Sequence, residues 1–153
     1  MCIRDSDNSE GQIVLSGKTQ DLEKLTEILK RNSIKNIKLP VSAPFHCSLM
    51  SKASEIMTEE LNKISFSDGS NKLISNVTAE PVSSTEDLKS LLIKQIENRV
   101  RWRESVLNMI NSNVDHFIEI GPGKVLSGLI KRINREVKIN TINSLEDIEN
   151  LKI

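Results

Sequence analysis

The end of the chain alternates short apolar runs with a segment of helical periodicity. Residues 114–120 and 137–142 are runs of strand length in which Val, Ile and Phe are interspersed with polar residues, and they predict short strands. Between them, a Gly-Pro-Gly turn at residues 121–123 breaks the first run, and residues 125–133 carry apolar side chains at helical spacing. Parallel strands need such a crossover, so this order favours an α/β fold with parallel strands.

The same alternation is present earlier in the chain. Residues 12–16 and 33–39 predict further strands, and Thr19 is placed to cap a helix between them. A short strand is expected over residues 72–77. Helices are expected over residues 48–64, after Ser84, from Trp102 and after Ser144. We therefore predict an α/β fold with a largely parallel sheet.

Composition narrows the class of protein. The 153 residues have room for one ordinary domain, and three Phe, one Trp and no Tyr leave the core to Ile, Leu and Val. The net charge of zero, with no basic stripe, gives no support for a nucleic-acid partner. No apolar run is long enough to span a membrane, and no secretion signal is present. We expect a cytoplasmic protein with neither a nucleic-acid nor a membrane partner.

The two cysteines, Cys2 and Cys47, form neither a disulfide framework nor a metal set, so no metal is expected. Residues 1–6 do not lead into a periodic pattern. We interpret them as a non-native leader or a truncation scar and exclude them from the predicted fold.

His46 is the first candidate for chemistry. Pro40 and Pro44 bracket an extended loop that places this histidine between an apolar run and a helix, where it can act as a base. Taken alone, a histidine in this position is more often a structural residue of the loop. Cys47 suggests a Cys-His pair, but adjacent side chains seldom face each other in the geometry that a thiol nucleophile needs.

Residues 121–124 (GPGK) look at first like a phosphate loop. The pattern G-x-x-x-x-G-K-[ST] is not satisfied, although the following helix N-terminus could still bind an anion. The commoner explanation is a tight turn that lets strand and helix pack closely.

Residues 41–46 (VSAPFH) and 117–129 (FIEIGPGKVLSGL) together resemble the C-terminal half of malonyl-CoA:acyl carrier protein transacylases. The resemblance runs from about Asn8 to the end of the chain. It implies the C-terminal part of an α/β-hydrolase-like acyltransferase core over residues 44–153. Residues 7–43 would form part of a ferredoxin-like small subdomain.

The activity implied is transfer of malonyl from malonyl-CoA to the phosphopantetheine thiol of acyl carrier protein through a serine acyl-enzyme, in fatty acid synthesis. The coenzyme A thioester is then the substrate and no further cofactor is needed. Malonyl-CoA and acyl carrier protein are the expected partners, and the full-length enzyme is expected to be a monomer.

The resemblance also assigns roles to single residues. His46 corresponds to the catalytic base, and Gln95, seven positions before Trp102, offers its backbone carbonyl to orient the imidazole. Phe45 is expected to select malonyl because its ring leaves no room for an extra α-methyl group. Asn8 corresponds to an asparagine near the substrate cleft. The sequence departs from the family pattern at Arg99, where proline is usual.

The serine nucleophile of such an enzyme is absent, because no G-x-S-x-G occurs in the chain. The serine, the malonyl-binding arginine and the oxyanion-hole loop would lie N-terminal to it. We therefore expect a fragment that is inactive alone. Two alternatives stay open: an acyltransferase domain of a polyketide synthase, and a non-catalytic module that binds a carrier protein. A serine hydrolase of the α/β type also pairs a serine with a histidine base, but its triad usually orients the histidine with an acid rather than with a backbone carbonyl.

Overall fold

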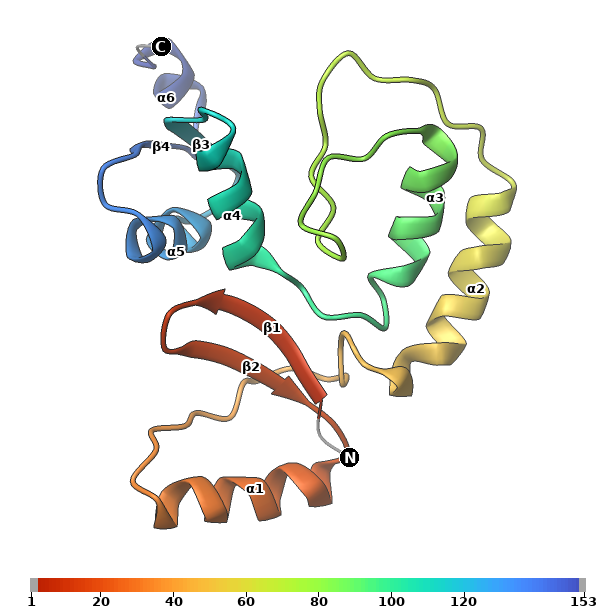
Figure 1. The fold of residues 1–153 in the computed structure, drawn as a ribbon, viewed down its shortest axis with the longest axis vertical. Helices are drawn as coiled ribbons and strands as arrows, with labels where there is room; N and C mark the ends of the chain where they lie inside the picture. The colour runs from red at the N-terminus through yellow and green to blue at the C-terminus, as the bar shows by residue number, and fades with distance from the viewer. Residues whose placement is uncertain (1–2, 152–153) are drawn as a thin grey trace.

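A computed structural model describes residues 3–151 of the chain (Figure 1). In chain order, the elements are β1 (Ile3–Ser9), β2 (Gln12–Ser16), α1 (Thr19–Arg31), the 3-10 turn η1 (Ser48–Met50), α2 (Ser51–Asn62), α3 (Thr85–Lys94), α4 (Trp102–Asn111), β3 (His116–Ile120), α5 (Val125–Ile133), β4 (Lys138–Ile142) and α6 (Leu145–Glu149). Figure 1 shows α2 and α3 side by side, apart from the group formed by α4, α5, β3 and β4. Within the described residues, no helix is long and apolar enough to cross a membrane.

The strand–helix–strand unit at the end of the chain is confirmed. β3 and β4 pair in parallel, with His116 opposite Lys138 and Ile120 opposite Ile142, and α5 forms the crossover. The buried core lies here. It is formed by the side chains of Val106, Phe117, Ile130 and Val137. The fold is therefore α/β, as predicted.

The prediction of a largely parallel sheet is wrong for the described residues. They form two separate two-stranded sheets, and β1 pairs with β2 antiparallel. Residues 33–39 form no strand, and residues 72–77 contribute only a single bridge between Ile74 and Pro81. Both segments carry apolar residues, but a strand also needs a partner for its backbone N–H and C=O groups, and neither segment has a ladder partner here.

The prediction that residues 1–6 stand outside the fold is wrong for residues 3–6, which belong to β1. Beyond its pairing with β2, β1 is tied to Val100, because Asp7 N–H donates to the Val100 carbonyl at 3.0 Å and Val100 N–H donates to the Asp5 carbonyl at 2.8 Å. The strand is hidden in the sequence because it is polar. Its buried Asp5 carboxylate accepts hydrogen bonds from the Ser6 and Ser16 hydroxyls. Cys2 lies outside the described residues.

Two of the three predicted helix N-caps are confirmed. Ser84 accepts a hydrogen bond from the Asp87 N–H at the start of α3, and Ser144 forms a capping box with Asp147 at the start of α6. Thr19 does not cap α1, because the residue in the cap position is Lys18 and Thr19 is already helical. The predicted helix over residues 48–64 begins as η1 and continues as α2.

Candidate functional site

His46 occupies a strained backbone position in the loop that precedes η1. Its φ is +57°, in the left-handed region that residues with a Cβ seldom adopt. Such a conformation persists only where the surroundings hold it in place. The half-buried ring is held by one contact from a distant part of the chain, because its Nδ1 lies 2.7 Å from the backbone carbonyl oxygen of Gln95. The structure therefore brings together the two residues that the sequence singled out.

This contact decides the tautomer of the neutral ring. A carbonyl oxygen can only accept a hydrogen bond, so the shared proton must sit on Nδ1 of His46. In the neutral imidazole, Nε2 then carries the free lone pair. A ring with its Nδ1 fixed and its Nε2 unprotonated has the geometry of a general base.

Gln95 can offer its carbonyl because it lies at the C-terminal end of α3, where it is the capping residue. The last carbonyls of a helix have no partner within the helix and must find one elsewhere. The histidine ring supplies that partner. The interaction uses the backbone, so it does not depend on the glutamine side chain.

Cys47 is not placed to act as a nucleophile. The side chain is 1% exposed, and its thiol donates to the Pro44 carbonyl at 3.1 Å. The contact closes the loop just before η1.

The other two predicted site residues, Phe45 directly before His46 and Asn8 in β1, take no part in the His46–Gln95 hydrogen bond. Phe45 is 43% exposed, so its ring is not used to fill the core of this chain. Asn8 is half-buried in β1. Among residues 3–151, no hydrogen bond joins Asn8 to His46.

The glycine-rich turn at residues 121–123 has a structural role. Gly121 and Gly123 both have positive φ, at +132° and +96°. At the start of α5, the Glu119 carboxylate accepts the N–H groups of Leu126 at 3.0 Å and Ser127 at 2.7 Å. The chain's own carboxylate thus occupies the helix N-terminus where an anion would bind. The Ser127 hydroxyl and the helix N–H groups lower the pKa of Glu119.

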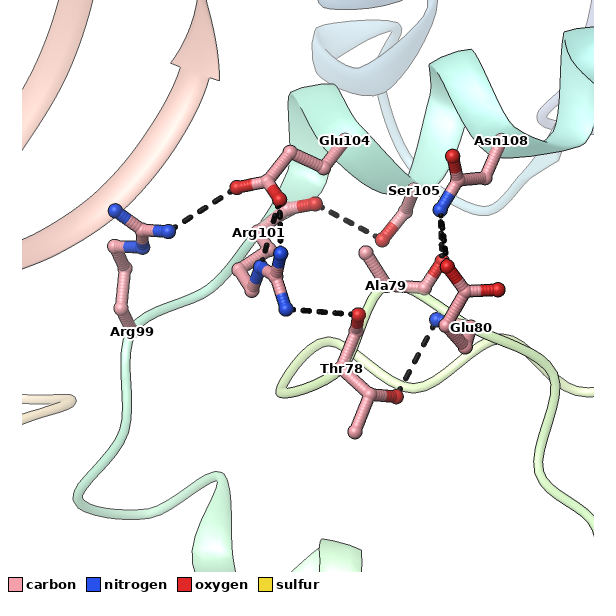
Figure 2. Close-up of polar contacts among 8 residues, drawn as sticks. All are labelled: Thr78, Ala79, Glu80, Arg99, Arg101, Glu104, Ser105 and Asn108. Atoms are coloured by element: carbon pink, nitrogen blue, oxygen red, sulfur yellow. Dashed lines mark hydrogen bonds and ion pairs between the residues drawn. The ribbon is translucent and has the colours of Figure 1, made fainter.

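The segment after Gln95 is held by polar contacts that sequence reasoning missed (Figure 2). Arg101 N–H donates to the Asn76 carbonyl at 2.9 Å, and its guanidinium donates to the Thr78 carbonyl at 2.9 Å and to Glu104. Arg99 also contacts Glu104. The arginine–glutamate spacing at the start of a helix was visible in the sequence, but not the path of the loop that brings the groups together.

Two apolar cavities flank α3 and share Gln95 as a wall. One, of about 190 Å³, lies against the segment from Leu73 to Asn76, and the other, of about 150 Å³, faces Met57 and Leu61 of α2. In residues 3–151, no three His, Cys, Asp or Glu side chains are grouped so as to hold a metal ion.

Comparison with known proteins gives a consistent result. No family model matches the chain. The malonyl CoA-acyl carrier protein transacylase of Bacillus subtilis is 43% identical over 143 residues, which is 93% of this chain and 45% of that protein. The protein of the same name from Staphylococcus aureus strain MSSA476 is also 43% identical, over 46% of its length.

Solved structures agree with the sequence comparison. The transacylase of Clostridium perfringens superposes with a TM-score of 0.92 at 42% identity, covering 98% of this chain and 48% of that one. The acyl-carrier-protein-S-malonyltransferase of Bartonella henselae gives a TM-score of 0.93 at 40% identity, with the same two coverages. The chain spans about half the length of the relatives it matches. The resemblance inferred from residues 41–46 and 117–129 is thus confirmed, and the chain is a relative of the malonyl CoA-acyl carrier protein transacylases across almost all of its own length.

Proposed function

We propose that this chain supplies the base-bearing half of an acyltransferase that moves malonyl from malonyl-CoA to the phosphopantetheine thiol of acyl carrier protein, in fatty acid synthesis. The observation that carries the proposal is the contact between His46 Nδ1 and the Gln95 carbonyl, which leaves Nε2 free to accept a proton. The names of the relatives support the choice of reaction.

The reaction proceeds in two proton-balanced steps. A serine oxygen attacks the thioester carbonyl of malonyl-CoA, His46 Nε2 takes the serine proton, and the C–S bond breaks with that proton passing to the coenzyme A sulfur. The carrier thiol then attacks the serine ester and gives its proton to Nε2. The ester C–O bond breaks, and the proton returns to the serine oxygen. The Gln95 carbonyl holds the ring throughout.

The serine of this scheme is not in the chain, which contains no G-x-S-x-G. We place it, with the malonyl-binding arginine and the oxyanion hole, in the part of the relatives' length that the chain does not span. The chain alone is then inactive. Many large apolar side chains are exposed on the chain, and this supports a missing half that would cover them. Among them are Ile13, Ile28, Ile37, Ile56, Ile120 and Val125.

The finer architecture follows the same proposal. Residues 44–153 are part of an α/β-hydrolase-like core, and residues 7–43, with the end of β1, all of β2 and α1, are part of a ferredoxin-like small subdomain. Phe45 limits the pocket to malonyl by steric exclusion of an α-methyl group, and Asn8 lies at the substrate cleft. The completed enzyme is a cytoplasmic monomer that needs no cofactor beyond its coenzyme A substrate.

A second carrier is supported by one solved structure. A type II PKS acyl-carrier protein in complex with its malonyl-transacylase contains a chain with a TM-score of 0.92 and 31% identity to this one. A polyketide carrier is therefore the alternative acceptor. A binding module without catalysis is the other alternative, although it would not need an oriented histidine.

The test is reconstitution. The chain is co-expressed with the complementary, serine-bearing half of the Bacillus subtilis relative, and malonyl transfer to a fatty-acid and a polyketide carrier protein is followed by intact mass. We expect transfer by the complex and none by either half alone. Association of the halves without transfer to either carrier would contradict the proposed catalysis and favour a binding module.

A further inference from the structure

Glu104 joins two arginines that lie on the segment between Gln95 and α4 (Figure 2). Its Oε1 is 3.1 Å from the Arg99 guanidinium, and its Oε2 is 2.9 Å from Nε of Arg101, with a further contact to the Arg101 terminal nitrogen. The three side chains are 33–35% exposed, so water screens the charges only in part. The carboxylate thus holds two cations that would otherwise repel each other.

The segment that these arginines belong to carries the Gln95 carbonyl. Arg99 lies four residues after Gln95, in a stretch from Ile96 to Val100 that forms neither helix nor strand. Backbone hydrogen bonds hold both ends of the stretch. At the near end, the N–H groups of Ile96 and Asn98 donate to the Ile93 and Lys94 carbonyls of α3, and at the far end Val100 pairs with β1 and Arg101 N–H donates to Asn76. Side-chain contacts to Glu104 hold the same end from α4.

The position of this carbonyl matters because it is the contact that fixes the ring. The Nδ1–O distance of 2.7 Å is short, and it is the one hydrogen bond described for the His46 ring. The backbone of His46 is in the left-handed region. A shift of the Gln95 segment therefore releases the imidazole.

We propose that Glu104 is a positioning residue for His46, acting through Arg99 and Arg101 to keep the Gln95 carbonyl at Nδ1. Its consequence for catalysis rests on the proposed function, whereas its effect on the ring does not. Glu104 touches neither His46 nor the reacting atoms.

The first test reads the ring directly in the 153-residue chain. The chain has only two histidines, so nitrogen-15 NMR resolves the tautomer of His46 beside that of His116, whose Nε2 is paired with Asn140 in the distant β3–β4 sheet. In Glu104→Gln, we expect His46 to lose its Nδ1–H preference while the His116 signal stays unchanged. An unchanged His46 signal in this variant would overturn the proposal.

Matched variants separate positioning from loss of the fold. Arg99→Gln should move the His46 signal and Arg99→Lys should restore it, because an ammonium group can still reach Oε1 of Glu104. Asn108→Ala, on the same helix, removes the contacts to Ala79 and Glu80 and should leave His46 unchanged. If Glu104→Gln unfolds, so that both histidine signals move together, the Arg99 pair carries the same test. Equal His46 signals in Arg99→Gln and Arg99→Lys would then contradict the proposal.

The second test is kinetic and uses the chain joined to a serine-bearing half. We expect Glu104→Gln to lower kcat about tenfold with KM nearly unchanged, because misplacement of a catalytic group weakens the transition state more than substrate binding. An equal rise in KM with kcat unchanged would count against positioning. If the unsubstituted complex transfers no malonyl, the proposed function fails, while the NMR result still decides the role of Glu104.

Discussion

Two regions of the molecule differ in how their apolar side chains are used. The C-terminal unit, residues 102–142, contains the buried cluster of Val106, Phe117, Ile130 and Val137. The histidine-bearing region, residues 19–64, has in α1 a helix with no buried residue, and Ile37 in the following loop is 76% exposed. Figure 1 shows α1 and its loop apart from the C-terminal unit.

The buried core that stabilises this chain and the histidine proposed for its chemistry therefore lie in different regions. The C-terminal unit buries a core cluster of its own, although it also exposes Ile120 and Val125. The histidine-bearing region leaves its apolar side uncovered, and His46 is fixed to the rest of the described chain by the Gln95 carbonyl. The candidate chemistry thus lies in the less buried region, where a partner half can complete it.

The largest contrast is expected between the two histidines, one in each region. In the reconstituted complex, His46→Ala should lower malonyl transfer by roughly 10²–10⁴-fold, because removal of a general base costs about that much. His116→Asn, in β3, should transfer at the unsubstituted rate, since this ring contacts only the Asn140 side chain in the described hydrogen bonds. Initial rates of carrier acylation give the comparison, and equal rates for both variants would remove His46 from the mechanism.

A second contrast compares two isoleucines in the chain alone. Ile130→Ala should lower the free energy of unfolding by about 2–5 kcal/mol, because Ile130 is 4% exposed within the core cluster. Ile37→Ala should change it by less than about 0.5 kcal/mol, since the side chain is already in water. Urea unfolding measures both.

The same pair sharpens the comparison once the serine-bearing half is bound. If that half covers the histidine-bearing region, Ile37→Ala should weaken association of the halves while Ile130→Ala acts mainly on folding. A large effect of Ile37→Ala on the isolated chain would show that this region buries its own core.

The smallest contrast concerns charge at a helix end. Glu119→Ala should destabilise the chain by about 1 kcal/mol at neutral pH, because the carboxylate accepts the N–H groups of Leu126 and Ser127 at the start of α5. Glu59→Ala, on the exposed surface of α2, should be nearly neutral.

The pH dependence of this contrast has a defined sign. The pKa of Glu119 is lowered in the folded chain, so its contribution is present above the ordinary glutamate pKa of about 4.3 and is lost as the pH falls through the lowered value. The difference between Glu119→Ala and the unsubstituted chain should therefore shrink in acid. Thermal unfolding across this range measures it, and a difference that grows in acid would contradict the role of the carboxylate.

Local signals in the sequence predicted a large part of the fold and of the site. Caps at Ser84 and Ser144 and the apolar runs of β3 and β4 depend on neighbouring residues, so they are visible in the sequence. The pairing of His46 with Gln95 was expected from the spacing of Gln95 to Trp102 in a related family, and the structure brings the two together.

The features that were missed depend on distant partners. β1 carries polar side chains whose partners are Ser16 and the backbone of Val100, so no apolar pattern marks it. Residues 33–39 have the pattern of a strand but no partner strand. The contact of Glu104 with Arg99 and Arg101 depends on the path of the loop after Gln95.

The most direct measurement of the central claim is the tautomer of His46 in the unsubstituted chain, read by nitrogen-15 NMR at a pH where the ring is neutral. The account predicts a proton on Nδ1, hydrogen-bonded to the Gln95 carbonyl, and a free lone pair on Nε2. A ring protonated on Nε2, or an even mixture of the two forms, would contradict it, because the histidine would then be neither oriented by Gln95 nor ready to accept a proton.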